Sequence, residues 1–269
     1  MIIAIITRTS IAAVGDQFTA TTTMLGRGYR MLRRQPLLFP IMLVQPMVWL
    51  LLYSQLFNRL PRLGGFGTDS YLQFLAPGIA VISAFSHGAW EGPGMIADIE
   101  RGALDRFLTT PMPPSTLVVS RTVQAAIIGS LQAAAVVAVA YAFGARPNDL
   151  ISVLVILVSA ALICAGFAAF SYALALLFRR QETMIAVGQF AVLPFMFLSA
   201  TLTSVAQMPP WMQEVSALNP VSWAVDAART SMLGTAGSRV LVDLAVLVLL
   251  VAAMQVFARF ALGRYRRAL

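Results

Sequence analysis

Six long apolar segments dominate this sequence, and each is close to the roughly 20 residues that a helix needs to cross a bilayer. They lie at about residues 36–57, 71–90, 115–143, 150–178, 183–204 and 240–260. Because lipid offers the backbone no hydrogen-bonding partners, each segment has to pair its own N–H and C=O groups, as a helix does. The sequence therefore predicts an all-α polytopic membrane protein with six transmembrane helices.

The composition argues against a soluble fold and against an enzyme. Hydrophobic residues make up 59% of the chain and charged residues 11%, against about 25% charged in an ordinary soluble domain. All nineteen basic residues are arginine, and a chain without lysine has neither a Walker A loop nor a Schiff-base lysine. A single histidine, His87, and a single cysteine, Cys164, leave no structural zinc site and no intrachain disulfide. We expect no catalytic residue, metal or cofactor on this chain, so any ATP and Mg²⁺ would be bound by another polypeptide.

The arginines predict the orientation and argue against nucleic acid as a partner. They form no stripe or tail but lie at the ends of the apolar segments, as the loop charges of a membrane protein do. With both termini in the cytoplasm, fourteen arginines fall on the inner side and five on the outer side. We therefore expect both termini to be cytoplasmic. Residues 2–6 are too short for the apolar core of a signal peptide, so no cleaved leader is expected.

Residues 1–35 are predicted to be a separate cytoplasmic or interfacial unit that precedes a transmembrane domain at 36–269. From Asp16 onward the pattern fits an amphipathic helix lying in the membrane interface. Its apolar face would hold Leu25, Tyr29 and Leu32, and its basic face Arg27, Arg30 and Arg34. A solvated basic linker that only fixes the topology is the alternative.

A charged segment, residues 93–114, separates the second and third apolar runs. Pro93 and Gly94 are expected to end the second span, and a short helix is predicted at about residues 96–108. On that helix Asp98, Arg101 and Asp105 would share one face, where neighbouring charges attract. A solvated loop with weak ion pairs is the alternative to a functional helix.

The fifth and sixth runs are separated by a long extracellular loop, residues 205–239. It contains MPPWMQ and LNPVSW, two apolar pieces broken by proline and carrying Trp211 and Trp223. We interpret them as short helices that dip into the outer leaflet, with the indoles as interfacial anchors. An ordinary surface loop is the alternative.

Few polar side chains lie within the spans. The glutamines are Gln45, Gln124, Gln132, Gln189 and Gln255. They either line a path for an amphipathic substrate or hydrogen-bond one helix to another. His87 and Glu91 lie four residues apart and therefore share a helical face. They form either a structural pair or a proton-coupling pair. Asp243 likewise has either a structural or a functional role.

Small residues recur every four positions in the third and fourth runs. They are Ala126, Ser130, Ala134, Ala138 and Ala142, then Ala161, Ala165, Ala169 and Ala173. Such stripes let helices pack closely in lipid, although alanine is abundant throughout the chain.

Three stretches carry a resemblance to a known family. They are FLAPGI at 74–79, DIERGALDRFLTTPMPPSTLVVSR at 98–121, and LSATLTSVAQMPPWMQEVSALNPVSW at 198–223. Over nearly its whole length the chain resembles the membrane subunit of type-2 ABC exporters, most closely the daunorubicin-resistance permease group. One departure is the absence of an obvious glycine before the outer proline–tryptophan piece, where Ala200 and Thr201 follow Ser199.

The resemblance implies a six-helix permease with an amino-terminal interfacial helix, a cytoplasmic coupling helix and outer re-entrant helices. It also implies a second permease copy, two separate ABC ATPase subunits and a place in a prokaryotic plasma (inner) membrane. The ATPase-coupling role would fall on Glu100, Arg101, Gly102, Asp105 and Arg106. The outer re-entrant positions would be Pro209, Trp211, Asn219 and Pro220. Independently of the resemblance, Gln45, Gln124, Gln132 and Gln189 are the candidates for either path-lining or helix-bonding polar residues.

The expected function is ATP-driven export of hydrophobic or amphipathic molecules such as drugs, antibiotics or lipids. Export of lipid-linked polysaccharide by the same fold is the alternative, though the aromatic content of 10% is not concentrated along a path. A non-transporting membrane scaffold or an ATP-independent proton-coupled carrier that uses His87 and Glu91 is a further alternative.

Overall fold

The structure is a computed structural model that describes residues 37–63, 66–68, 70–104, 115–235 and 237–267. Every regular element in these ranges is helical, which confirms the predicted all-α class. The helix expected within residues 1–35 lies outside the described residues.

Five helical stretches in the described part are long and apolar enough to cross a membrane. They are α2 (Leu38–Leu56), α3 (Tyr71–Ala89) with its continuation α4 (Gly92–Glu100), α6 (Ser115–Ala142), α7 (Leu150–Phe178) and α11 (Ser238–Arg266). The other helices are α8 (Gln181–Phe197), α9 (Pro210–Leu218) and α10 (Pro220–Met232), with short 3-10 turns at Leu60–Leu63 and Val205–Gln207. The chain is therefore a multi-pass membrane protein, as the apolar pattern predicts.

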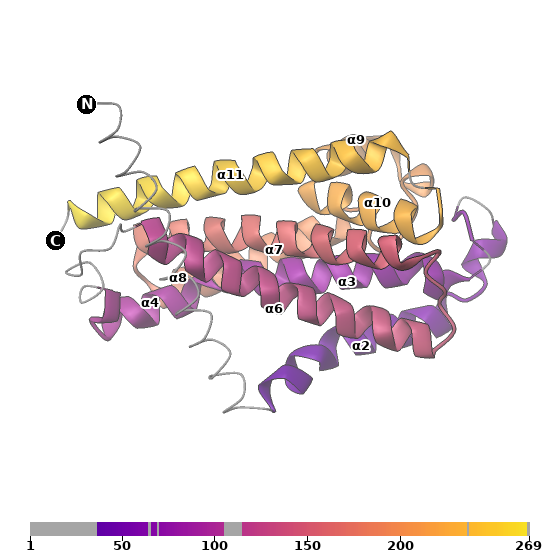
Figure 1. Cartoon of the computed structure of the whole chain (residues 1–269), viewed down its shortest axis with the longest axis horizontal. Coiled ribbons are helices and arrows are strands. Elements are labelled where there is room, and N and C mark those ends of the chain that lie inside the picture. Colours follow the sequence, from indigo (N-terminus) through magenta and orange to yellow (C-terminus); the bar gives the residue numbers. More distant parts are fainter. Residues whose placement is uncertain (1–36, 64–65, 69, 105–114, 236, 268–269) are drawn as a thin grey trace, which may run out of the picture.

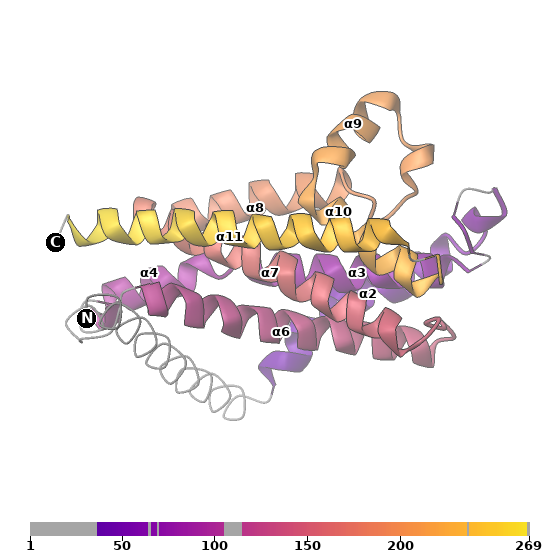
Figure 2. The same cartoon turned by 45° about the horizontal axis from the view of Figure 1, so that its top comes forward.

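The long helices run side by side along the long axis of the molecule (Figure 1). α7 is central and packs against α3, α6, α10 and α11. One end of the bundle holds α4, the α7–α8 turn and the carboxyl end of α11, and we call it the α4 end (Figures 1 and 2). The opposite end holds the connections from α2 to α3, from α6 to α7 and from α10 to α11.

Glycines mark the closest approaches to α7. A Cβ atom on Gly88 of α3 would lie 2.4 Å from the carbonyl oxygen of Cys164, and one on Gly129 of α6 would lie 2.8 Å from the Cys164 sulfur. Close packing of α3 and α6 on α7 therefore depends on these two glycines. Neither belongs to the predicted small-residue stripes, which only partly face other helices.

The fifth span is shorter than the sequence predicts. α8 has 17 residues and ends at Phe197, although the apolar run continues to Ser204. At 1.5 Å per residue it is about 26 Å long, against a hydrocarbon core of about 30 Å. That α8 crosses the membrane completely, as a sixth transmembrane helix, therefore stays a prediction.

The side chain of Asn219 explains where α8 ends. Its Nδ2 donates to the carbonyl oxygens of Phe195 at 2.9 Å and Leu198 at 3.1 Å. These carbonyls would otherwise accept bonds from the next turn of α8, so a residue between α9 and α10 provides the partners that let the helix stop.

Candidate functional site

The first part of the candidate site is an elbow between α3 and α4, and its local structure differs from the prediction. α3 ends at Ala89, and α4 begins at Gly92 with Pro93 in its first turn. Proline is well suited to a first turn because its missing N–H would be unpaired there anyway, so Pro93 starts a helix rather than ending the span.

The predicted single helix at 96–108 is wrong in its bounds. α4 ends at Glu100, and Gly102 then adopts a left-handed backbone with φ of +64°. Glycine tolerates this conformation because it has no Cβ. The residue type at position 102 therefore favours a turn directly after α4. Asp105 and Arg106, two of the predicted coupling residues, lie outside the described residues.

Three helices meet at Gly92. Its backbone N–H donates to Ser171 Oγ at 2.9 Å, and that hydroxyl donates to the carbonyl oxygen of Ala89 at 2.8 Å. A Cβ atom on Gly92 would lie 2.7 Å from Ser171 Oγ and 2.4 Å from the terminal carbon of Met184 on α8. The start of α4 is thereby fixed to α7 and α8 by contacts that leave no room for a side chain.

Glu91 joins the elbow to α7 through its carboxylate. Tyr172 Oη donates to Glu91 Oε2 at 2.5 Å, and His87 Nε2 lies 3.3 Å from Glu91 Oε1. His87 and Glu91 share a face of the chain, as their spacing predicts. Tyr172 is a further partner of Glu91 that could not be inferred from the spacing. The hydrogen bond to Glu91 gives the buried Tyr172 hydroxyl the partner that a buried polar group needs, which is consistent with a structural role for this cluster.

The other end of α4 is tied to α6. Asp98 forms an ion pair with Arg121, and the two side chains are each 25% exposed. The sequence-based expectation paired Asp98 with Arg101 within one helix, whereas the structure gives it a partner on the next helix. Arg121 was missed as a site residue, although a lone arginine inside an apolar run signals that a partner is needed.

α4 has a buried apolar side and an exposed charged end. Met95 and Ile96 are fully buried, whereas Glu100 and Arg101 are exposed and Gly102 is partly exposed. The predicted coupling residues that the structure describes thus lie together at the tip of α4, at the α4 end of the bundle. This arrangement leaves their charged groups accessible to a partner while the helix itself is held against α7 and α8.

The two proline-containing pieces that the sequence predicts within residues 205–239 form α9 and α10. α9 projects from the bundle (Figure 2), and Pro209 and Trp211 are exposed there, Trp211 by 61%. α10 is instead packed against α3, α7 and α11, so the alternative of a simple surface loop is wrong for this helix. Pro220 forms the first residue of α10, and Asn219 caps it by accepting from the N–H of Val221 at 2.9 Å.

Arg229 fixes α10 to the start of α3. This side chain is only 7% exposed, and its Nε and Nη2 donate to the carbonyl oxygens of Phe74 and Thr201, each at 3.1 Å. The guanidinium also lies over the Phe74 ring, 3.7 Å from its centre. A Cβ on Gly78 would lie 2.7 Å from the same Thr201 oxygen, which gives the glycine of FLAPGI a packing role.

The structure does not bring the predicted glutamines together. Gln45 on α2 and Gln189 on α8 are exposed, Gln124 on α6 is partly buried, and Gln132 is 4% exposed. Within the described residues the Oε1 atoms of Gln132 and Gln255 are buried without a hydrogen-bond partner. In the same residues no group of three histidine, cysteine, aspartate or glutamate side chains is placed to hold a metal ion.

Comparison with known proteins agrees with this architecture. Residues 19–233 match the ABC-2 type transporter family. The daunorubicin resistance ABC transporter permease protein DrrB1 of Streptomyces coeruleorubidus is 30% identical over 81% of this chain and 77% of its own length. Putative transport permeases of Porphyra purpurea and Cyanophora paradoxa are 29% and 30% identical over 73% and 74% of this chain, which cover 68% and 69% of those proteins. The chain therefore belongs to the ABC-2 type transporter family and is a transmembrane permease, the membrane-embedded transport subunit of an ABC transporter.

Proposed function

We propose that this chain is the permease subunit of an ATP-driven exporter that moves hydrophobic or amphipathic molecules, such as drugs, out across a membrane. A second permease copy and two ABC ATPase subunits complete the transporter, and the ATPases bind the nucleotide. The similarity to a daunorubicin resistance permease supports the substrate class.

The elbow at α4 is the observation that carries the proposal. Its exposed tip, with Glu100 and Arg101, is where an ATPase would press on the permease. Its base is joined to α7 through Gly92 and Ser171, and its last turn is joined to α6 through Asp98 and Arg121. A push on the tip is therefore delivered to two long helices at once, as a rigid-body transition requires.

The distribution of arginines supports placing the α4 end in the cytoplasm. That end carries Arg101, Arg121, Arg179, Arg180, Arg259, Arg264, Arg266 and Arg267. Positively charged residues favour the cytoplasmic side, where an ATPase would also be found. Both termini are cytoplasmic in this proposal, in the plasma membrane of a prokaryote.

The proposal is tested by charge reversal at the tip of α4. The variant Glu100→Arg with Arg101→Glu keeps the net charge and leaves the buried side of α4 intact. It should lose most ATPase stimulation and ATP-dependent dye export in vesicles that also hold the partner ABC ATPase. Arg266→Glu, at the end of α11, is the matched control and should retain both activities.

Two results would reject the proposal. One is full export and ATPase binding by the doubly reversed variant, which would place the coupling contact elsewhere. The other is uptake or efflux that needs no ATPase, follows a pH gradient and disappears in His87→Ala, which would establish the proton-coupled carrier. Export of a lipid-linked polysaccharide but of no cationic dye would keep the coupling mechanism and change the substrate class.

A further inference from the structure

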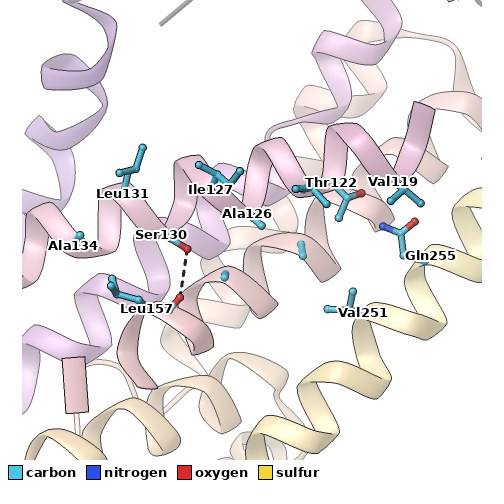
Figure 3. Close-up of a pocket in the computed structure, with 13 residues that line it drawn as sticks. Val119, Thr122, Ala126, Ile127, Ser130, Leu131, Ala134, Leu157, Val251 and Gln255 are labelled. Atoms are coloured by element: carbon cyan, nitrogen blue, oxygen red, sulfur yellow. Dashed lines mark hydrogen bonds between the residues drawn. The ribbon is translucent and has the colours of Figure 1, made fainter. Parts of the chain in front are cut away.

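An open groove of about 550 Å³ runs along the outside of the bundle between α6, α7 and α11 (Figure 3). Residues 119–134 of α6 form one wall and residues 157–165 of α7 contribute the second, while Val251 and Gln255 of α11 form the third. Members of the alanine stripes on α6 and α7 line this groove, so their small size leaves space open here rather than closing a helix contact.

The dimensions of the groove fit a single flexible chain. Its α6 wall spans 15 steps of about 1.5 Å, so the groove is roughly 22 Å long, more than half of a hydrocarbon core of about 30 Å. Dividing 550 Å³ by that length gives a mean cross-section of about 25 Å². A chain one carbon wide needs roughly 15 Å², whereas another helix needs at least about 80 Å². The groove therefore has the width of one flexible chain, and a helix would lie across its open side rather than inside it.

The polar atoms of the groove are distributed unevenly along it. Ser130 Oγ, near the middle, donates to the carbonyl oxygen of Leu157 at 3.4 Å. Toward the α4 end, Thr122 is 3% exposed, and within the described residues its Oγ1 and the Oε1 of Gln255 are buried without partners. Figure 3 shows Gln255 reaching from α11 toward Thr122 and Val119 on α6. A ligand at this end would satisfy both atoms if it accepted a hydrogen bond from the Thr122 hydroxyl and donated one to Gln255 Oε1.

A cation lies one turn beyond this polar end. Arg259 follows Gln255 by four residues on α11, so the two share a face, and the Arg259 side chain is exposed. Arg121, by contrast, is already paired with Asp98. The groove thus has an apolar body, then two hydrogen-bonding atoms, then a positive charge.

We propose that the groove binds one acyl chain of an anionic phospholipid whose headgroup carries hydroxyl groups, such as phosphatidylglycerol. An ester carbonyl accepts a hydrogen bond from the Thr122 hydroxyl, a headgroup hydroxyl donates to Gln255 Oε1, and the phosphate lies at Arg259. This order of apolar, polar and charged groups is the order found along a phospholipid from tail to headgroup. The inference requires only that the bundle spans a bilayer, and it stands independently of ATP-driven export.

The test uses the full chain in nanodiscs made from equal amounts of phosphatidylglycerol and phosphatidylcholine. A phosphatidylglycerol with a photoreactive diazirine in its acyl chain is the probe, and the labelled peptides are identified by mass spectrometry. Labelling should concentrate on residues 119–134 and 157–165. Ala161→Leu should reduce it at least about fivefold, because the larger side chain takes the space of several methylene groups. Ala138→Leu is the matched control, since Ala138 belongs to the same stripe as Ala126 but is exposed and lies outside the groove, and its labelling should be unchanged.

The headgroup part is tested with Arg259→Gln. The preference for photoreactive phosphatidylglycerol over photoreactive phosphatidylcholine should fall from about fivefold to near unity. Arg264→Gln, on another face of α11, should keep the preference. Ala126→Leu repeats the filling test at the opposite wall if Ala161→Leu does not fold.

Three results would overturn the inference. They are labelling that neither filling variant changes, a lipid preference that Arg259→Gln leaves intact, and disulfide cross-linking of Ala126→Cys between two copies in the bilayer. The last result would assign the groove to a second permease copy.

Discussion

Asp98, in the last turn of α4, forms an ion pair with Arg121, near the start of α6, and both side chains are three-quarters buried. An exposed pair of this kind contributes little, but burial reduces screening by water and raises the cost of leaving one charge alone. The pair joins the short helix at the α4 end to one of the longest helices of the bundle, so it connects the last turn of α4 to a second membrane-spanning helix besides α3.

Reversing one charge of this pair should impair coupling, and reversing both should restore part of it. Asp98→Arg and Arg121→Asp each place like charges side by side and should destabilise the elbow by about 1–3 kcal/mol. The double swap should recover at least about 1 kcal/mol of that loss, because the attraction is re-formed. ATPase stimulation and thermal unfolding of the four proteins form a double-mutant cycle that measures the interaction. Strictly additive effects would show that the two side chains do not interact.

Gly92→Ala should be destabilising although alanine favours helices. The added Cβ would lie 2.7 Å from Ser171 Oγ, so α4 and α7 have to move apart and the hydrogen bond from the Gly92 N–H lengthens. We expect a loss of about 1–3 kcal/mol, as for other overpacked sites.

Gly94→Ala is the matched control within the same helix. A Cβ on Gly94 meets no atom within 4 Å, so this change should be neutral or should stabilise α4 by about 0.5–1 kcal/mol. The melting temperatures of the two purified variants in detergent make the comparison. Equal melting temperatures would contradict the close approach at Gly92.

Asn219→Ala should free the end of α8. The substitution removes two bonds to the carbonyl oxygens of Phe195 and Leu198 and the cap on the N–H of Val221. Buried groups left unpaired cost about 1–3 kcal/mol each, so the α8–α10 connection should loosen and export should fall strongly.

The loosening is measured by thiol labelling of Leu198→Cys with and without Asn219→Ala. Labelling should be several-fold faster in the Asn219→Ala background, because the turn that covers this site opens more often. Asn58→Ala, at an exposed position after α2, is the control and should have no such effect. Unchanged labelling would mean that the end of α8 is held by other contacts.

Asp149 should make the start of α7 sensitive to acid. Its Oδ1 accepts from the N–H and the hydroxyl of Ser152, both at 2.7 Å, and these bonds hold the pKa of the Asp149 carboxyl below its usual range. Because the folded-state pKa is lowered, the stabilisation is complete above the unfolded value of about 3.9 and is lost as the pH falls through the folded value.

The measurement compares the wild type with Asp149→Ala across pH. The variant should melt at a lower temperature at pH 7. The difference should shrink as the pH falls below about 4, where the Asp149 carboxyl of the unfolded chain takes up a proton, and should disappear once the pH is below the folded-state pKa. Asp243→Ala on α11 serves as a control, since it leaves the Asp149 cap intact. A melting difference that stays constant with pH would exclude an ionised cap.

Much of the fold was predictable because lipid solubility is a property of the local sequence. The first, third and fourth apolar runs coincide with α2, α6 and α7 to within two residues, since nothing but their own composition decides where they enter lipid. The existence of α9 and α10 was also predictable from their proline-containing starts. The end of α8 was not, because it is decided by Asn219 from a later part of the chain.

The candidate site shows the same division between local and long-range information. The sequence by itself determined that the chain is a helical membrane protein and that a charged, glycine-broken segment follows the second span, because composition and backbone preference act within a few residues. Only the tertiary structure decided which groups meet: Asp98 with Arg121, Glu91 with Tyr172, and Arg229 with Phe74. The physical reason is that a buried charge or hydrogen-bonding group takes the partner that packing brings within reach, and the order of residues along the chain does not record that distance.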